Sequence, residues 1–311
     1  MKVLVTCPPM LGMIDDFRPL FDEAGIELTA PNVVQTMSVE ELIQTVPNHD
    51  GWIIGDDPAT REVFTAGKAG NLKAAVKWGI GVDNVDFDAC TDLGIPITNT
   101  PNMFGGEVAD IAVGYVIALA RETFQIDSGV RDGNWPKPRG ISLFDKTVAL
   151  VGFGDIGTNT ARRLLAAGMN INAYDPISKT PGDLVGKVQR KNWPEDIQDA
   201  DFIVVTSSLT SSSKHMLNDD VLSGAKTGVR IINVGRGPVI DERALERALS
   251  TGIVYSAALD VFEEEPLPMS SMMRNHPRCV FGSHNASNTS DAVIRTSEIA
   301  IEKLLGFLEG V

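Results

Sequence analysis

The sequence predicts an α/β protein with two doubly wound parallel-sheet domains. Short apolar runs recur along the chain, and an amphipathic stretch follows most of them; this alternation is typical of parallel sheets with helices on both faces. The runs are almost wholly apolar, as expected of strands that are covered on both sides. The length of 311 residues exceeds the roughly 100 to 200 residues of one domain, so two domains are expected.

The elements fall into two series. In the first series, strands are predicted at residues 2–6, 26–29, 51–54 and 72–76. Helices are predicted between them at residues 16–24, 39–45 and 60–67. The second series has strands at residues 147–151, 170–174, 202–206, 230–234 and 254–258, with a further short apolar run at 279–281.

Two more helices are predicted outside these series. Residues 107–121 are apolar at helical spacing and are expected to bridge the two domains. Residues 291–308 read as a C-terminal helix, and such a tail is too short to be a domain. We therefore expect residues 291–311 to complete a first domain of residues 1–100, with a second domain of residues 101–290 inserted between them.

The composition excludes several classes of protein. The 41 acidic and 27 basic side chains leave a net charge of −14, a field that repels nucleic-acid phosphates and anionic lipid headgroups. Cys7, Cys90 and Cys279 are too widely spaced for a disulfide framework or a zinc site, so a reducing cytoplasm and no metal are expected. No secretory signal and no apolar run of roughly 18 residues is found. Neither a nucleic acid nor a membrane is expected as a partner.

The strongest local motif is a GxGxxG turn that directly follows the strand at 147–151 and opens a helix. Gly152 permits the tight turn, Gly154 lets the backbone approach a pyrophosphate, and Gly157 allows close packing of the helix on the sheet. Asp155 and Ile156 begin the helix, whose free N–H groups face the anion. The context of strand, turn and helix therefore predicts a dinucleotide site of the Rossmann type.

Asp175 stands at the end of the next strand, where a carboxylate is expected to accept the ribose hydroxyls of the dinucleotide. A carboxylate there repels a 2′-phosphate, so NAD is favoured over NADP. Arg162 and Arg163 leave an opening for NADP, but we expect both to face solvent.

Further candidates follow later strands. Arg236 comes after the strand at 230–234, between two glycines and before a proline, where it could present its planar guanidinium to a carboxylate. A surface cation in a turn is equally consistent with the spacing alone. Of the four histidines, His284 follows the apolar run at 279–281, whereas the other three lie in polar segments and are expected to be solvated. Two of the three glutamates at 263–265 are also expected to be solvated.

Residues 233–242, residues 259–266 and His284 together resemble the D-isomer-specific 2-hydroxyacid dehydrogenase family. The resemblance extends through residues 79–86, 99–102 and 131–135, in the family's order, and covers nearly the whole chain. It implies a Rossmann NAD-binding domain inserted in a flavodoxin-like substrate domain. It also implies hydride transfer between NAD and C2 of a small 2-hydroxy or 2-oxo acid. The homodimer common in the family would use residues 107–121.

The resemblance also implies roles for individual residues. Arg236 corresponds to the arginine that orients the substrate, Glu265 to the carboxylate paired with the catalytic histidine, and His284 to the general acid/base. Asp260 corresponds to the residue that holds the nicotinamide carboxamide. Further implied contacts to the cofactor are at Thr206 and Val234, and implied contacts to the substrate are at Lys77, Gly79, Ile80 and Gly81.

The implied chemistry suits these residue types. A histidine can supply a proton to the carbonyl oxygen near neutral pH, and a neighbouring carboxylate raises the histidine pKa. An arginine places positive charge where negative charge develops. Related formate dehydrogenases carry glutamine in place of Glu265, which argues against formate.

The sequence departs from the patterns of its relatives in two places that affect which substrate is expected. Lys77 stands where many members have arginine, so the charge is kept and the planar fork is lost. Phosphoglycerate dehydrogenases are the closest overall resemblance, but Asp56 and Asp57 follow the strand at 51–54 and repel a phosphate dianion. D-3-phosphoglycerate therefore stays open, and glyoxylate or hydroxypyruvate is the alternative. A non-catalytic NAD-sensing regulator of the same fold is the rival from another class.

Overall fold

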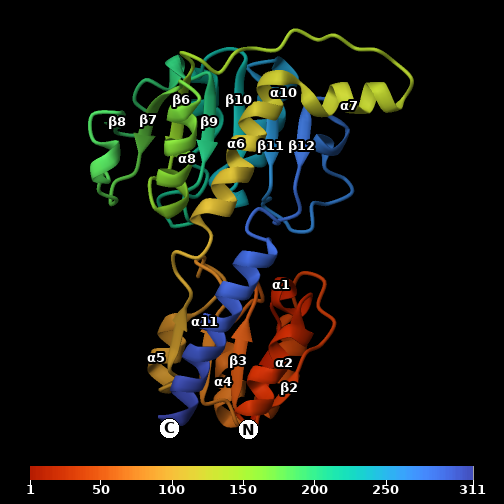
Figure 1. Cartoon of the computed structure of the whole chain (residues 1–311), viewed down its shortest axis with the longest axis vertical. Coiled ribbons are helices and arrows are strands. Elements are labelled where there is room, and N and C mark those ends of the chain that lie inside the picture. Colours follow the sequence, from red (N-terminus) through yellow and green to blue (C-terminus); the bar gives the residue numbers. More distant parts are fainter. Residues whose placement is uncertain (311) are drawn as a thin grey trace. The chain divides into compact units, whose positions relative to one another are not determined.

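The computed structural model describes residues 1–310 and divides into two compact units (Figure 1). The first comprises Met1–Met103 together with the C-terminal stretch that starts at Asn288, and the second is Phe104–Ser287. Each unit contains one sheet in which every pairing between strands is parallel. The prediction of two parallel-sheet α/β domains is confirmed.

The first unit has a five-stranded sheet with the order β2-β1-β3-β4-β5, the order of the flavodoxin-like fold. Its strands are β1 (Lys2–Val5), β2 (Glu27–Thr29), β3 (Gly51–Ile54), β4 (Ala74–Lys77) and β5 (Ile97–Asn99). Strands β3 and β4 are buried along their whole length. Trp52 of β3 packs its ring 5.9 Å from that of Phe64 in the core beneath the sheet.

Helices cover this sheet on both faces. They are α1 (Pro8–Leu11), α2 (Ile14–Glu23), α3 (Val39–Thr45), α4 (Arg61–Ala69), α5 (Phe87–Leu93) and α11 (Ser290–Glu309). Ser38 and Glu41 form a capping box that starts α3. Helix α11 packs on β3 and β4, with Leu304 against Gly51 and Ser297 accepting a hydrogen bond from Trp78 Nε1 at 3.1 Å. The C-terminal helix thus belongs to the first unit.

The second unit has a seven-stranded sheet with the order β12-β11-β10-β9-β6-β7-β8. Its strands are β6 (Thr147–Val151), β7 (Asn170–Tyr174), β8 (Val188–Lys191), β9 (Phe202–Val205), β10 (Val229–Asn233), β11 (Val254–Leu259) and β12 (Cys279–Phe281). Strand β6 lies between β7 and β9, so the order of strands reverses there. Such a reversal is the usual place for a dinucleotide to bind at the carboxyl ends of the strands.

The helices of the second unit are α6 (Gly105–Arg121), α7 (Thr123–Arg131), α8 (Asp155–Ala166), α9 (Asp219–Gly224) and α10 (Glu242–Thr251). Helices α6 and α8 pack side by side across one face of the sheet (Figure 1). Because α6 lies wholly in the second unit, the prediction that residues 107–121 bridge the domains is wrong, and the chain passes between the units at Met103 and Phe104. Asp241 caps α10 by accepting a hydrogen bond from Ala244 N at 3.0 Å.

Within residues 1–310, no helix has both the length and the apolar character needed to cross a membrane. The same residues contain no cluster of histidine, cysteine and carboxylate groups suited to hold a metal ion.

Candidate active site

The glycine-rich turn after β6 requires glycine at two positions for steric reasons. Gly152 has φ +94°, and a Cβ there would lie 2.6 Å from Ser207 N. A Cβ at Gly157 would overlap the carbonyl oxygen of Gly152. Gly154 differs, because no atom lies within 4 Å of the position of its Cβ. The turn is therefore tightly packed behind Gly152 and Gly157 and open at Gly154, the predicted point of approach for a pyrophosphate.

Thr206 follows β9 and ties the next loop to this turn. Its hydroxyl lies 3.0 Å from the carbonyl oxygen of Gly152 and 3.2 Å from that of Val151. Val234, the other residue with an implied cofactor contact, is buried and donates its N–H to Val205 O at 3.1 Å. Both residues thus shape the carboxyl edge of the sheet around β6, β9 and β10.

The side chain of Asp155 is turned toward the start of α6. A Cβ at Gly105 would overlap the Asp155 carboxylate, so this contact needs glycine at the first residue of α6. Asn159 Nδ2 donates to Asp155 Oδ1 at 3.1 Å. Asp155 and Ile156 form the first turn of α8, directly after the N-cap Gly154.

Asp175 lies at the end of β7 and accepts four hydrogen bonds. Oδ1 accepts from the N–H groups of Ile177 and Ser178, and Oδ2 accepts from Phe153 N and from the Ser178 hydroxyl, all at 2.8 Å. Partial burial raises the pKa of Asp175, but these hydrogen bonds outweigh it and hold the pKa below its usual value. Asp175 is therefore ionised at neutral pH, as the preference for NAD requires.

Arg162 and Arg163 of α8 form ion pairs with carboxylates other than Asp175. Arg162 forms a two-point ion pair with Asp183, at 2.7 and 3.1 Å, and Arg163 pairs with Asp110 at 2.7 Å. Both are partly exposed on α8, as expected. Arg190 was not singled out from the sequence because its strand β8 was missed.

Arg190 supports the Asp175 loop from β8. It donates to the carbonyl oxygen of Asp175 and places its guanidinium 4.9 Å from the centre of the Phe153 ring. It thereby links the glycine-rich turn, through Phe153, to the loop after β7.

Arg236 occupies the turn after β10, and its neighbours explain the two flanking glycines. A Cβ at Gly235 would lie 2.6 Å from Ser207 O, and a Cβ at Gly237 would overlap the backbone of Phe262. Asn233 fixes the turn by accepting from Gly235 N and donating to Arg236 O, both at 3.0 Å. Arg236 is therefore held in a constrained turn against the loops that follow β9 and β11, which disfavours the alternative of a loose surface cation.

Glu265 and His284 form an ion pair in the second unit. His284 Nδ1 lies 2.7 Å from Glu265 Oε2, and both side chains are about three-quarters buried, with exposed fractions of 24% and 22%. The other carboxylate oxygen of Glu265 accepts from Phe262 N at 2.9 Å. Glu263 and Glu264 are exposed, as expected for two of the three glutamates. His284 thus directs Nδ1 at the Glu265 carboxylate.

Asp260 anchors the loop that carries His284. Its side chain is buried, and its two oxygens accept from Asn285 N at 3.2 Å and Ala286 N at 2.9 Å. Its backbone oxygen accepts from His284 N at 2.7 Å. This anchoring role was not foreseen from the sequence, because it depends on the pairing of β11 with β12.

Arg236, Glu265 and His284 come from loops after three adjacent strands. Strands β10, β11 and β12 are neighbours in one parallel sheet, so their carboxyl ends share an edge. The topology thus places three predicted site residues, which are widely separated in sequence, at one edge of the sheet.

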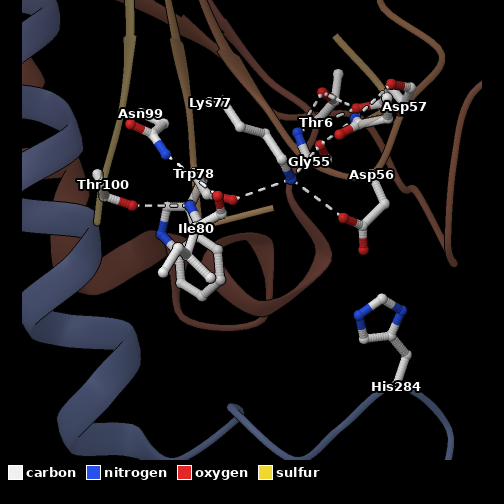
Figure 2. Close-up of polar contacts among 12 residues, drawn as sticks. Thr6, Gly55, Asp56, Asp57, Lys77, Trp78, Ile80, Asn99, Thr100 and His284 are labelled. Carbon is white, nitrogen blue, oxygen red and sulfur yellow. Dashed lines mark hydrogen bonds and ion pairs between the residues drawn. The ribbon is translucent and has the colours of Figure 1, made fainter. Parts of the chain in front are cut away.

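The predicted substrate residues of the first unit follow β4 (Figure 2). Gly79 has φ +121° and donates its N–H to Thr100 Oγ1 at 2.7 Å, so this amide is already used. Asn99 Nδ2 donates to Ile80 O at 3.2 Å and steadies the same loop. The predicted receptor for a substrate carboxylate is therefore reduced to the backbone at Ile80 and Gly81.

Lys77 has no N–H group left for the substrate contact that the resemblance implies. Its ammonium donates to Gly55 O at 2.7 Å, to Trp78 O at 3.1 Å and to Asp56 Oδ1 at 3.1 Å (Figure 2). An ammonium has three N–H donors, so all three are used within the chain. Lys77 thus holds the loops after β3 and β4 together.

The other histidines have structural partners. His49 is buried, with Nδ1 2.9 Å from Thr45 O and Nε2 2.8 Å from Thr29 Oγ1, so the expectation that it is solvated is wrong. His215 is partly exposed and pairs with Glu263 at 3.0 Å. The pKa of His276 is lowered by partial burial and by the nearby Arg278.

Known proteins resemble the chain in sequence and in structure. Residues 113–286 match the model of the D-isomer specific 2-hydroxyacid dehydrogenase, NAD binding domain. The chain is 34% identical over 291 residues to hydroxypyruvate reductase from Thermotoga maritima, covering 92% of each protein. It is 37% identical over 295 residues to D-3-phosphoglycerate dehydrogenase 2 from Arabidopsis thaliana, covering 93% of this chain and 47% of that protein.

The chain thus spans about half the length of the Arabidopsis relatives that it matches. Among solved structures, the apo form of D-lactate dehydrogenase from Escherichia coli superposes with a TM-score of 0.85 at 26% identity, over 100% of this chain and 98% of that one. The match to the family model and the full-length similarity to the Thermotoga protein agree with each other. The chain belongs to the D-isomer specific 2-hydroxyacid dehydrogenase family.

Proposed function

We propose that the protein is an NAD-dependent oxidoreductase that transfers hydride between the nicotinamide and C2 of a small 2-hydroxy or 2-oxo acid. The observation that carries this proposal is the His284–Glu265 pair, at 2.7 Å, in the unit that matches the NAD binding domain of the family. The pair is a proton donor and acceptor poised for general acid–base catalysis. Catalytic roles for Arg236, Glu265 and His284 are part of the proposal.

The residues present fit NAD. The open space at Gly154 suits a pyrophosphate at the start of α8, and the ionised Asp175 disfavours the 2′-phosphate of NADP. Because four donors already surround the Asp175 carboxylate, we expect ribose hydroxyls to replace the Ser178 hydroxyl, the donor that can rotate away. When bound, NAD supplies or takes up the hydride at C2.

The proton moves through His284. In the direction of reduction, protonated His284 gives the proton on Nε2 to the carbonyl oxygen of the 2-oxo acid. Glu265 holds Nδ1 and favours the imidazolium before transfer. In the direction of oxidation, neutral His284 takes the hydroxyl proton. Asp260 keeps the imidazole in position through the backbone of Asn285 and Ala286.

The substrate is oriented by charge and by backbone amides. Arg236 binds the substrate carboxylate and polarises the carbonyl, which stabilises the negative charge that develops on its oxygen. In the first unit, the amides of Ile80 and Gly81 are the proposed donors to a carboxylate group of the substrate. Gly79 instead holds the loop through Thr100.

Steady-state kinetics tests this function. NADH consumption is measured with glyoxylate, hydroxypyruvate and 3-phosphohydroxypyruvate as substrates. Turnover of at least one acid supports the proposal, and its loss in His284→Ala with NADH binding retained supports the role of His284. Tight NADH binding without turnover of any acid would instead favour the alternative, a non-catalytic NAD-sensing regulator.

The candidate substrates differ in charge, because only the phosphorylated acid carries a phosphate on C3. The Thermotoga relative is named a hydroxypyruvate reductase, and the Arabidopsis relatives are named D-3-phosphoglycerate dehydrogenases. We propose hydroxypyruvate or glyoxylate as the substrate class, because the similarity to the Thermotoga protein covers 92% of both chains. D-3-phosphoglycerate is the second candidate.

We further propose that the protein is a homodimer in the cytoplasm. Ile111 and Ile117 of α6 are 37% and 43% exposed, and Phe124 at the start of α7 is 52% exposed, which supports an apolar interface there. Cys7, Cys90 and Cys279 are free thiols, as is usual in a reducing compartment. Sedimentation at several concentrations tests the dimer.

A further inference from the structure

Lys77 and Asp56 form an ion pair at the start of the predicted substrate loop of Gly79, Ile80 and Gly81. The Lys77 side chain is only 3% exposed, and its ammonium is saturated by Gly55 O, Trp78 O and Asp56 Oδ1. A lysine in this position therefore offers no free N–H group to an anionic ligand. Its charge is balanced by the Asp56 carboxylate at 3.1 Å.

The two aspartates that follow β3 have different surroundings (Figure 2). Asp57 is fully buried and accepts from the Thr6 hydroxyl, from Met37 N at 2.8 Å and from Gly55 N at 3.2 Å. Asp56 has a side chain that is 38% exposed. Asp57 is thus part of the interior of the first unit, whereas Asp56 brings its carboxylate to the surface.

This surface lies at the carboxyl edge of the first sheet. Strands β3 and β4 are parallel neighbours, so the loops that begin at Gly55 and Trp78 leave the sheet at the same edge. Lys77 Nζ lies 3.8 Å from the position of a Cβ at Gly79, and it also bonds to Asp56. The ammonium therefore bridges the Asp56 carboxylate and the start of the loop of Gly79, Ile80 and Gly81 (Figure 2).

We propose that Asp56 determines specificity by excluding substrates with a second anionic group, so that the preferred acid is unphosphorylated. This inference rests on the proposed function of the Gly79–Gly81 loop in binding the substrate carboxylate. A phosphate on C3 would meet the Asp56 carboxylate, and like charges at short range repel. Lys77 weakens this repulsion through its pair with Asp56, but it has no N–H group left to donate to a phosphate, because its three donors are used within the chain.

Substitution of Asp56 tests the proposal in the full chain. The measurement is the ratio of kcat/KM for 3-phosphohydroxypyruvate to kcat/KM for hydroxypyruvate. In Asp56→Asn we expect this ratio to rise about tenfold, the size of effect expected of one close like-charge contact at a protein surface. Asp56→Glu keeps the charge and should keep the ratio low. Raising the salt concentration should weaken the discrimination in the wild type and leave Asp56→Asn little affected.

A matched control removes the same charge elsewhere in the first unit. Asp22 is exposed near the end of α2, which leads to the amino end of β2 and so to the opposite edge of the sheet. Asp22→Asn should leave the ratio within about twofold of wild type, because a distant exposed charge is screened. Thermal unfolding of each variant establishes that it is folded.

The outcomes separate this inference from the proposed function. A ratio that does not change in folded, active Asp56→Asn overturns the inference, as does a wild type that prefers the phosphorylated acid. Absence of turnover with these two acids and with glyoxylate overturns the proposed function instead. In that case calorimetric binding of the two acids in the presence of NADH still decides the inference: Asp56→Asn should gain affinity for the phosphorylated acid alone, and equal gains or no gain would refute it.

Discussion

His284 Nδ1 lies 2.7 Å from Glu265 Oε2, although 19 residues separate the two in sequence. The contact forms because β11 and β12 are adjacent parallel strands, so the loops after them leave the sheet at the same edge. Asp260 fixes the second of these loops through two backbone N–H groups. The geometry thus presents Nδ1 of the imidazole to the Glu265 carboxylate.

The charge of Glu265 should be needed for catalysis. Glu265→Gln keeps the size of the side chain but removes the charge that favours the imidazolium. We expect kcat/KM for reduction of the 2-oxo acid to fall by roughly 10- to 100-fold, a part of the 10²–10⁴-fold that general acid–base catalysis provides. The limb of the pH profile that reports His284 should also move to lower pH. An unchanged pH profile would show that the contact has only a structural role.

Substitutions at two glycines of the turn after β6 should have separate effects, one on folding stability and the other on cofactor binding. Gly157→Ala places a Cβ against the carbonyl oxygen of Gly152, so we expect the free energy of unfolding to fall by about 1–3 kcal/mol. Gly154→Ala meets no atom within 4 Å and should leave that free energy unchanged while weakening NADH binding. Urea unfolding and fluorescence titration measure the two effects. Wild-type affinity for NADH in Gly154→Ala would argue against a pyrophosphate at this position.

The carboxylate of Asp175 should set the preference between NADH and NADPH. Asp175→Asn removes the charge that repels a 2′-phosphate, together with hydrogen bonds to a charged acceptor worth about 1.5–3 kcal/mol each. We expect weaker binding of NADH and a preference for NADH over NADPH reduced by roughly tenfold or more. Ser178→Ala, which leaves the carboxylate in place, should retain the preference. The dissociation constants of NADH and NADPH measure this preference. An equal loss of affinity for both cofactors in Asp175→Asn would contradict the role of Asp175.

Asp57 should make stability depend on pH. Burial raises the pKa of Asp57, although hydrogen bonds from Met37, Thr6 and Gly55 oppose the shift. The native state therefore keeps a proton that the unfolded chain, with a pKa near 3.8, releases. The free energy of unfolding should fall as pH rises from 3.8 through the raised pKa, by about 1.4 kcal/mol for each unit between the two pKa values.

The control for this prediction is Asp57→Asn, which cannot titrate. The difference in the free energy of unfolding between wild type and Asp57→Asn should shift in favour of the variant as pH rises across the same window. Urea unfolding at several pH values measures this difference. A constant difference across the window would mean that the Asp57 pKa is the same in both states.

The parts of the fold that the sequence predicted best are the buried strands. The limits of β6 and β7 agree with residues 147–151 and 170–174; β6 is a nearly continuous apolar run, and β7 has the apolar residues Ile171, Ala173 and Tyr174. Strand β8 was missed because it lies at the edge of the sheet and contains Gln189, Arg190 and Lys191. Strand β5 has only three residues, and helix α7 has no buried residue, so neither shows a clear hydrophobic pattern.

Only those parts of the site that carry a sequence motif could be predicted. The glycine-rich turn, Asp175 and the Glu265–His284 pair have sequence signatures; their functional roles stay predictions, and the structure adds their local contacts. No sequence signature shows that all three N–H donors of Lys77 are used, or that Asp56 and Asp57 differ in burial. Both features depend on contacts between loops from different strands. From the sequence the two aspartates look alike, whereas only Asp57 is buried completely.

The central claim is that Nε2 of His284 exchanges the proton while hydride moves between NAD and C2 of a 2-oxo or 2-hydroxy acid. The most direct test is consumption of NADH with hydroxypyruvate or glyoxylate by the wild type and by His284→Ala, with NADH affinity measured for both. We predict turnover by the wild type and a fall in kcat of about 10²–10⁴-fold in His284→Ala, with little change in NADH affinity. Equal kcat values in the two proteins, or no turnover by the wild type, would contradict the account.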